Sequence, residues 1–514
     1  MVASNRYFVQ TSGSSFWPKL CADLSNSFDL GFAVIDDRLE AEFRNLPCGE
    51  IILGNDLKFG LFDRTKCEPF PTELRNKFHF RKREKEAIYS LDRSNVGGHL
   101  PLQERLLLIS TFADYFWHLF KVHEPSFGLA TESPHTLGDI LLHGVAESLA
   151  IPILHFQQNP VMPSVRPVLG PYYDRVETTN ALGDAGEADR VARLKPFRSS
   201  VEAFVTQACE PGLARHESAL HARDRSTFSG PKSGWRRFYV PFDWLSGEQR
   251  QYKIYASRVR KDFRSLPLPI HQETVGHGPI AIALRSLGLS WQQRRQLTKL
   301  REALMSVSDS HLPPAHGTFF LQFEPEKSSM PDGGMFSDQL AAARSIASAL
   351  QGKMPLVVRE HPSQLTLIAR GFRVRTPRFY DELSRIPNVI IASPEIPREA
   401  ILQRTKVAIT LQGSIGLEAR ARGLPVIALG HPWYVPLSGV FSPERFNNIE
   451  EMITASLEWC PSVPDEVADE LWSLIESDSI VVLLNPSAAG LFPNVENDVE
   501  TLSRLVRFHF ASKA

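Results

Sequence analysis

The chain has 514 residues, of which 43% are hydrophobic and 22% are charged. This length exceeds what one hydrophobic core ordinarily serves, so we expect at least two domains. A formal net charge of -1 at pH 7 gives no general attraction to nucleic acid, which is therefore not expected as a partner.

The cysteines and the N-terminal segment indicate the compartment. The five cysteines are scattered and show no C-x-x-C spacing, so neither a disulfide framework nor a structural zinc site is expected. The N-terminal segment lacks the basic and apolar regions of a signal peptide, and no stretch reaches the roughly 20 apolar residues that span a bilayer. We expect a soluble, cytoplasmic protein, and peripheral contact with the inner membrane stays open.

In the first half of the chain, short apolar stretches alternate with amphipathic ones. Residues 100–123 and 135–150 predict helices. Predicted strands cover residues 7–12, 31–37, 50–54, 127–133 and 151–158. This alternation is typical of an α/β domain with a parallel sheet. The "SGSS" turn after the first strand resembles the first loop of a Rossmann-type fold, and a simple capped turn is the alternative.

The pattern is less regular between about residues 160 and 310. The Pro-rich stretch "VMPSVRPVLGPYYDRV" (161–176) predicts irregular structure. Residues 190–225 and 247–306 carry helical spacing, and "QQRRQLTKLREAL" (292–304) indicates a solvated helix face. The segment "SDSHLPPAHG" (308–317) predicts a linker between domains.

The second half repeats the alternation more clearly. Predicted strands cover residues 318–324, 355–361, 388–393, 406–412 and 425–430. Predicted helices lie near residues 335–351, 378–386, 397–404 and 414–422. We therefore expect an α/β fold with two Rossmann-like, doubly wound domains that face a cleft.

The expected domains are residues 1–310 on the acceptor side, with a helical insertion, and residues 318–480 on the nucleotide side. Residues 481–514 form a tail or helix for which packing against the first domain is one possibility.

The segment "LQGSIGLEARARGLPVIALG" (411–430) places a turn of small residues before a predicted helix. Ser414 is expected to be the N-cap, so the N–H groups after Gly413 carry partial positive charge and suit a phosphate. Glu418 lies one helical turn later on the same face, where its carboxylate can accept hydrogen bonds from ribose hydroxyls. The alternative is a capped helix in which Glu418 pairs with a nearby arginine such as Arg422.

The segment "VVREHP" (357–362) ends a predicted strand in a His-Pro pair. Pro362 favours an extended backbone at His361 and a turn after it, so the imidazole points out from the carboxyl end of the strand. There it can donate a hydrogen bond to a phosphate oxygen and assist the departure of a nucleotide. The alternative is a histidine that only stabilises the turn.

A long polar loop follows the first strand of the second half, in "LQFEPEKSSMPDGGMFSDQL" (321–340). Loops at the carboxyl ends of parallel strands often bind ligands. Glu324 and Glu326 are candidates for contact with the nucleoside, and capping of the loop by Glu324 is the alternative.

In the first half, "TESPHTLGD" (131–139) joins a strand to a helix. Glu132 and Asp139 are candidates for a catalytic base that accepts a proton from an acceptor hydroxyl. The alternative is that Glu132 and His135 only cap the helix.

Aromatic residues follow the last predicted strand in "GHPWYVPLSG" (430–439). His431, Trp433 and Tyr434 could stack on a base or sugar ring, or pack against the neighbouring loop. No D-x-D stands at a strand end and no histidine pair has helical spacing, so neither a metal nor another cofactor is expected.

Together these segments resemble the bacterial capsule polysaccharide biosynthesis proteins, the group that includes the Kdo transferases of capsule assembly. Besides the two segments at 321–340 and 357–362, the resemblance is carried by "RFYDELSRIPNVIIASPE" and "ITLQGSIGLEARARGLPVIALGHPWY". It extends over about residues 318–442 and fits less closely at "SPHTLGDILLHGVAESLAIP".

The resemblance implies a metal-independent glycosyltransferase of the GT-B type with a cytidylyl-activated donor, for which CMP-Kdo is a candidate substrate. It implies that His361 and Pro362 are the His-Pro motif at the donor phosphate, that Gly413 and Ser414 form the phosphate turn, and that Glu418 binds the nucleoside. The usual lysine before Glu-His-Pro is Arg359 here, and Ile415 replaces a small residue or threonine.

The expected function is sugar transfer from a nucleotide-activated donor to a glycan or glycolipid acceptor. Two alternatives stay open, a nucleotide-sugar 2-epimerase of the same architecture and a non-catalytic protein of glycan binding or assembly.

Overall fold

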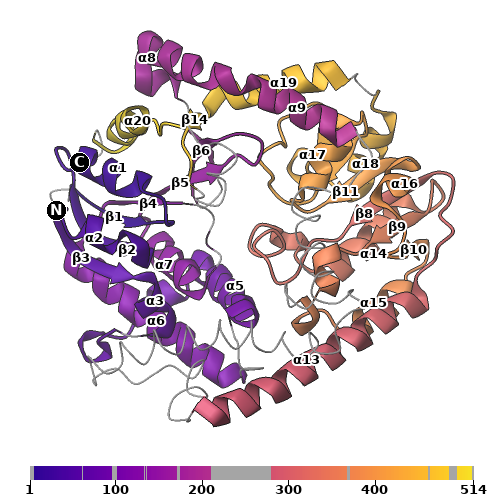
Figure 1. Cartoon of the computed structure of the whole chain (residues 1–514), viewed down its shortest axis with the longest axis horizontal. Coiled ribbons are helices and arrows are strands. Elements are labelled where there is room, and N and C mark those ends of the chain that lie inside the picture. The colour runs from indigo at the N-terminus through magenta and orange to yellow at the C-terminus, as the bar shows by residue number, and fades with distance from the viewer. Residues whose placement is uncertain are drawn as a thin grey trace. The chain divides into compact units, whose positions relative to one another are not determined.

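The computed structural model describes residues 5–60, 62–94, 101–131, 134, 136–170, 174–176, 178–209, 279–366, 371–460, 464–484 and 495–511. Their contacts divide the chain into two units. The first unit holds the described residues up to Glu202 and those from Trp472 onward, and the second holds those from Ala203 to Leu471 (Figure 1). Each unit is built on its own sheet of mainly parallel strands, so the predicted α/β class with two Rossmann-like domains is confirmed. A cleft between the domains stays a prediction.

The sheet of the first unit runs in the order β14-β6-β5-β4-β1-β2-β3, and β7 pairs with β6. The strands are β1 (Arg6–Gln10), β2 (Asp29–Ile35), β3 (Cys48–Leu53), β4 (Phe127–Ala130), β5 (Ile153–Gln158), β6 (Ser164–Leu169), β7 (Asp174–Arg175) and β14 (Ile480–Val481). The strands from β3 to β5 are parallel, and β6 is antiparallel to its neighbours. All five strands predicted in this half are present.

Helices cover both faces of this sheet, because successive side chains on a strand point to opposite faces. On β1, Phe8 belongs to the hydrophobic core beneath α5, α6 and α7, whereas Tyr7 and Val9 belong to the core beneath α1 and α20 (Figure 1). The helices are α1 (Phe16–Leu24), α2 (Glu40–Phe43), α3 (Gly54–Phe59), α4 (Thr72–Arg75), α5 (Phe78–Ser94), α6 (Leu102–His123), α7 (Leu137–Ser148), α8 (Thr179–Leu194) and α20 (Val499–Ala511). The division between the units falls within α9 (Arg198–Cys209) and α19 (Pro464–Asp478).

The second unit has a six-stranded sheet in the order β10-β9-β8-β11-β12-β13, with every pair parallel. The strands are β8 (His316–Phe320), β9 (Leu356–Arg359), β10 (Val389–Ile391), β11 (Thr405–Thr410), β12 (Val426–Ala428) and β13 (Val440–Phe441). Numbered along the chain this order is 3-2-1-4-5-6, the order of a dinucleotide-binding Rossmann domain. It reverses between β8 and β11, where ligands of such sheets bind.

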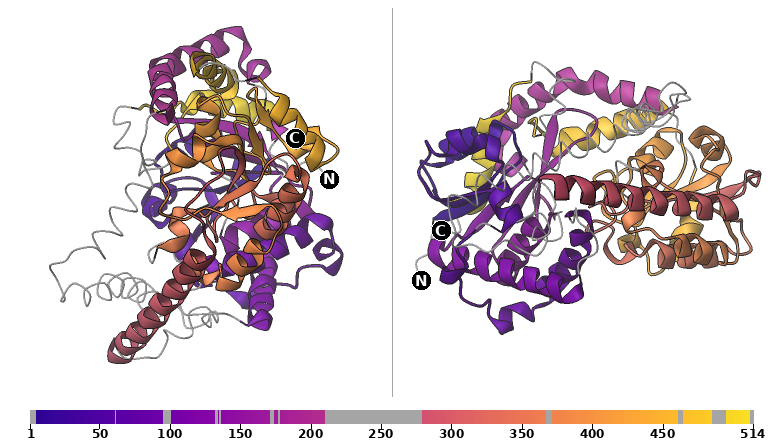
Figure 2. Two further views of the ribbon diagram at one scale, coloured as in Figure 1. Left: turned by 90° about the vertical axis from the view of Figure 1, so that its right-hand side faces the viewer. Right: turned by 60° about the horizontal axis from the view of Figure 1, so that its bottom comes forward.

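The helices of the second unit are α13 (Pro279–Val307), α14 (Gln339–Leu350), α15 (Pro377–Ser384), α16 (Arg398–Leu402), α17 (Ser414–Ala421) and α18 (Ile449–Glu458). The long α13 packs beside α15 (Figure 2). Its residues Leu297, Leu300 and Leu304 lie in the same hydrophobic core as Phe319 of β8, so the predicted solvated helix has a buried apolar stripe.

Three expectations for the middle of the chain differ from the structure. The linker expected at residues 308–317 lies inside the second unit, where the N–H of Asp309 donates to the carbonyl of Ile391 and Leu312 is buried. The first domain was expected to extend to residue 310, but the core contacts of α13 place that helix in the second unit. The stretch expected to be irregular contains β6, in which Pro167 lies opposite Phe156 of β5.

The C-terminal segment lies in the first unit. β14 pairs antiparallel with β6, and α20 contacts α1 and α8. The side chains of Ser12 and Ser14 in the "SGSS" turn donate to the carbonyls of Leu484 and Leu483, so the turn after β1 is attached to this returning segment.

Candidate functional site

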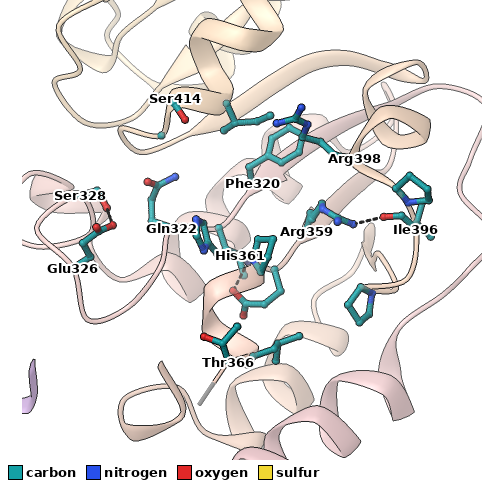
Figure 3. Close-up of a pocket in the computed structure, with 18 of the residues that line it drawn as sticks. Phe320, Gln322, Glu326, Ser328, Arg359, His361, Thr366, Ile396, Arg398 and Ser414 are labelled. Carbon is teal, nitrogen blue, oxygen red and sulfur yellow. Dashed lines mark hydrogen bonds between the residues drawn. The ribbon is translucent and has the colours of Figure 1, made fainter. Parts of the chain in front are cut away.

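A cavity of about 1040 Å³ lies in the second unit at the carboxyl ends of its strands (Figure 3). Its walls come from the segments that follow β8, β9, β10 and β11, with a contribution from α13. The residues that line it from these segments include Gln322, Glu326 and Ser328 after β8, Glu360, His361 and Pro362 after β9, Pro394 to Arg398 after β10, and Gln412 to Ile415 with Glu418 after β11. The cavity therefore occupies the point where the strand order reverses.

His361 lies at this cavity in the conformation that the His-Pro pair predicts. Its backbone is extended, with φ -69° and ψ 128°, and it precedes the short helix η5 (Pro362–Leu365). The ring Nδ1 accepts a hydrogen bond from the backbone N–H of Ser363 at 3.2 Å. In a neutral ring the proton is then on Nε2, because a nitrogen that accepts cannot carry the proton. The ring is half-buried and can act as a donor into the cavity.

Glu360 fixes the backbone of the His361 loop. Its Oε1 accepts from the N–H of His361 at 2.7 Å, and its Oε2 accepts from Arg375 at 2.9 Å and from the Tyr380 hydroxyl at 2.6 Å. Burial raises the pKa of Glu360, while Arg375 and Tyr380 oppose this effect by stabilising the carboxylate. Every oxygen of this carboxylate is engaged, so Glu360 supports the loop.

The turn before α17 lines the same cavity, with one difference from the prediction. Gly413, at φ -64° and ψ 147°, is the N-cap, and the exposed Ser414 is the first helical residue. A Cβ atom on Gly413 would lie 2.7 Å from Nε2 of Gln322 and 2.9 Å from Oγ1 of Thr410, so only glycine fits. The first N–H groups of a helix have no intrahelical acceptor, and those that follow Gly413 belong to the wall of the cavity.

Tyr434 fixes this turn from behind. Its buried hydroxyl donates to the carbonyl of Gly413 at 2.6 Å, and a Cβ atom on Gly416 would lie 2.3 Å from that hydroxyl. Of the two roles considered for Tyr434, stacking on a ligand ring and packing against a loop, the structure gives the packing role.

Glu418 lies at the cavity and pairs with an arginine, as the alternative reading expected, although that arginine is not Arg422. Its Oε2 is 2.5 Å from Nη1 of Arg398, and both side chains are nearly buried. Arg422, the expected partner, pairs with Glu399 instead. Because Glu418 is one turn into α17 and Arg398 begins α16, the pair joins two walls of the cavity.

Glu324 and Glu326 have different environments. Glu326 lines the cavity and accepts a hydrogen bond from the hydroxyl of Ser328 at 2.8 Å. The carboxylate of Glu324 accepts from Gln339 at 2.7 Å and lies 3.2 Å from Arg375, and the residue is not in the cavity lining described. The alternative considered for Glu324, a role in holding the loop, fits this geometry better than contact with a nucleoside.

Of the candidate bases in the first unit, Glu132 and the neighbouring His135 lie outside the described residues. Asp139 forms a capping box at the start of α7. Its N–H donates to the Thr136 hydroxyl at 3.3 Å and its carboxylate accepts from the Thr136 N–H at 3.2 Å. The structure gives Asp139 a capping role, and a role as catalytic base stays a prediction.

The sequence did not single out Gln322 or Arg398, although both line the cavity. Gln322 was placed inside the predicted strand 318–324, but β8 ends at Phe320. Its side chain lies beside His361 and below Ser414 in Figure 3. A polar residue at a strand end was the available signal for Gln322. Arg398 offered no such signal, because its importance comes from the pairing with Glu418 across twenty residues of chain.

The described residues contain neither a candidate metal site nor a candidate membrane span. No group of three or more His, Cys, Asp or Glu side chains there could hold a metal ion. No helix of the described part is both long and apolar enough to cross a membrane.

The sheet order and the cavity at its reversal point define a Rossmann-like unit with a candidate nucleotide site. Residues 290–441 match the family model described as "Capsule polysaccharide biosynthesis protein". This match confirms the predicted resemblance for the segment that carries the cavity. No curated protein matches the chain.

Among solved structures, the chain is similar to two parts of KpsC from Thermosulfurimonas dismutans. The similarity to its beta Kdo 2,4 transferase has 14% identity and a TM-score of 0.25, and it covers 67% of this chain and 79% of that one. The similarity to its beta Kdo 2,7 transferase has 16% identity and a TM-score of 0.21, with 35% of this chain and 61% of that one covered. A UDP-GlcNAc 2-epimerase from Methanocaldococcus jannaschii has 12% identity and a TM-score of 0.20, with 98% of each chain covered.

Proposed function

We propose that this protein is a glycosyltransferase that moves a sugar from a nucleotide-activated donor to a surface or capsular polysaccharide acceptor. One observation carries the proposal: the His361 ring, the helix start at Gly413–Ser414 and the Glu418 carboxylate line a single cavity. That cavity lies within the segment that matches the capsule polysaccharide family. CMP-Kdo is the candidate donor, and a glycan or glycolipid is the candidate acceptor.

The proposed chemistry depends on charge that develops on the leaving nucleotide. As the bond between sugar and phosphate breaks, negative charge grows on the phosphate oxygens. Nε2–H of His361 and the N–H groups after Gly413 are donors fixed in advance, so they stabilise this charge without reorganisation. Glu418 would accept hydrogen bonds from ribose hydroxyls while sharing its carboxylate with Arg398.

The acceptor hydroxyl must lose a proton to a base. Glu132 and Asp139 are the proposed candidates, and the capping contacts of Asp139 make Glu132 the first to test. The donors in the cavity supply the positive field without a cation, so we propose a reaction that does not require a metal and expect transfer to persist in a chelator.

The experiment that tests the function uses a labelled nucleotide sugar and separates the products. A labelled glycan supports the transferase, an isomerised donor supports a 2-epimerase, and neither product supports a binding protein. In parallel, the melting temperature should rise more with cytidine monophosphate than with uridine diphosphate. An equal response to both nucleotides, or to neither, contradicts a cytidylyl donor.

A further inference from the structure

A row of buried polar groups runs within the second unit from the loop of His361 to the turn of Gly413. We call this row the buried polar network. Its members are Glu360, Arg375, Glu324, Gln339, Gln322 and Thr410. These residues come from the segments after β8 and β9, from the end of β11, from α14 and from the segment before α15, so elements far apart in the sequence meet through side-chain hydrogen bonds.

Arg375 stands at the centre of the network. Its side chain is fully buried, with Nη1 2.9 Å from Oε2 of Glu360 and Nη2 3.2 Å from Oε2 of Glu324. The guanidinium also lies 4.1 Å from the ring centre of Phe379. A planar fork of donors is the geometry needed to bridge two carboxylates at once, and an ammonium group on lysine cannot reproduce it.

From Glu324 the network continues to the phosphate turn. The carboxylate of Glu324 accepts from Nε2 of Gln339 at 2.7 Å, and Oε1 of Gln339 accepts from the N–H of Gln322 at 2.6 Å. Nε2 of Gln322 donates to Oγ1 of Thr410 at 2.7 Å, which also accepts from the N–H of Gly413 at 3.2 Å. At the other end, Glu360 accepts from the N–H of His361.

Movement of the His361 loop or of the Gly413 turn would therefore leave buried groups without their partners. A buried carboxylate or amide that loses its partner destabilises the folded state, and the effect is larger when the group is charged. The members are buried or nearly so, with Gln339 1% and Arg375 2% exposed, which keeps water from replacing the lost bonds. The network therefore holds the His361 loop and the Gly413 turn in one fixed arrangement.

We propose that Arg375 is a positioning residue that couples the His361 loop to the Gly413 turn. Through the buried polar network it holds the imidazole donor and the helix start in one geometry around the leaving phosphate. The ligand named here rests on the proposed function, whereas the coupling itself can be measured on the protein alone.

The test compares Arg375→Lys with Tyr380→Phe. The lysine keeps the positive charge but cannot bridge Glu360 and Glu324. The phenylalanine removes the hydrogen bond from Tyr380 to the same Glu360 oxygen. Tyr380 does not lie between the two loops in the network, so this variant is the control. Gln339→Leu is a second test variant, since it removes the side-chain link between Glu324 and Gln322. Arg375 stays in place in this variant and keeps its 3.4 Å contact with the carbonyl of Gln322.

Two measurements report on the two ends of the buried polar network, and neither needs a nucleotide sugar. The ring nitrogens of His361, followed by NMR with ¹⁵N-labelled histidine and assigned with His361→Gln, should show a proton on Nε2 alone. Hydrogen exchange of the Gly413 amide reports the turn. We expect the NMR signals of Arg375→Lys to show the His361 proton on both ring nitrogens instead of Nε2 alone. Hydrogen exchange of the Gly413 amide should become faster by about tenfold or more.

Gln339→Leu should accelerate the same amide and also change the His361 signals, although it lies on the far side of Arg375. Tyr380→Phe should leave Gly413 exchange unchanged. If Arg375→Lys and Gln339→Leu each disturb only the nearer loop, or if Tyr380→Phe has the same effect at Gly413, the coupling does not exist. If Arg375→Lys does not fold, Gln339→Leu decides the question by these criteria. Failure to transfer sugar would overturn the proposed function and leave these signals as they are.

Discussion

His361 is held by two hydrogen bonds, one to its ring and one to its backbone. The Ser363 N–H occupies Nδ1, and the N–H of His361 itself is held by Glu360. In a neutral ring this loop therefore keeps the proton on Nε2 before any ligand binds.

We expect His361→Ala to lower transfer by about 100- to 1000-fold, the effect of removing one fixed donor from a developing negative charge. The free energy of unfolding should fall by only about 1 kcal/mol, because one partly exposed hydrogen bond is lost. Initial rates and urea unfolding measure the two effects. His311→Ala is the control, since that side chain is 99% exposed and pairs only with Asp309 among the contacts described. A large loss of stability with activity retained would assign His361 to the turn.

The Glu418–Arg398 pair offers a second test at the same scale. Glu418→Gln removes the charge that would attract ribose hydroxyls, so we expect nucleotide affinity to fall by about tenfold, the effect of roughly one charge-assisted hydrogen bond. Glu399→Gln breaks the neighbouring pair with Arg422, and Glu399 is absent from the cavity lining described. Isothermal titration with cytidine monophosphate compares the variants. Equal losses of affinity would show that Glu418 acts on the fold of this region and not on the ligand.

The sequence predicted the residues whose role follows from local geometry. A proline after His361 and a glycine before a helix constrain the backbone within a few residues, and both constraints hold in the structure. The partners of Glu418 and Glu360 could not be predicted, because Arg398 and Arg375 reach them only after the sheet has assembled.

Among the secondary-structure elements, α7 has a start that is fixed by side chains of the first unit. Thr136 and Asp139 satisfy each other's backbone N–H groups in a capping box, which accounts for the carboxylate without reference to a substrate. The same carboxylate was a candidate for the catalytic base. The two roles predict different results for two variants of one motif.

We expect Asp139→Ala and Thr136→Ala each to reduce the free energy of unfolding by about 0.5–2 kcal/mol, since each loses the cap. Transfer rates per folded molecule should be similar in the two variants. A base role for Asp139 would instead lower transfer in Asp139→Ala alone, by about 100-fold or more. Thermal unfolding and initial rates at saturating donor provide the comparison.

The apolar parallel strands were predictable as elements because both of their faces are buried, which leaves short runs of hydrophobic residues. The strand β6 was missed because the prolines of residues 161–176 favour irregular structure, although an antiparallel strand next to the short β14 tolerates Pro167. Helix α5 was not predicted at all. Its charged residues include Arg83 and Glu86, which are buried and joined to each other, and Arg83 also pairs with Glu147 of α7.

In the molecule as a whole, the first unit is built from two separate parts of the chain, with the second unit between them. The second unit ends near Leu471, and the chain then returns to complete the first unit with β14 and α20. The sequence predicted two α/β domains. It also predicted that the second resembles the capsule polysaccharide biosynthesis proteins, and the family match over residues 290–441 agrees with this. It could not predict that α13 belongs with the second unit, because the helix pattern does not say which core receives its leucines.

The return of the chain makes a stability prediction that two residues of α20 can test. Phe510 is 5% exposed and stacks on Phe127 of β4, with 4.1 Å between ring centres, whereas Phe508 on the same helix is 48% exposed. Phe510→Ala should lower the free energy of unfolding by about 3–5 kcal/mol, because it leaves a cavity between the helix and the sheet. Phe508→Ala, with the same change in composition and helix propensity, should change it by about 0.5 kcal/mol or less. Urea unfolding measured by far-UV circular dichroism and by tryptophan fluorescence follows the effect, since Trp17 of α1 lies in the core that α20 covers. Equal effects of the two substitutions would mean that α20 is not anchored on the first sheet in solution, and that the first unit reaches its stability without the segment that returns to it.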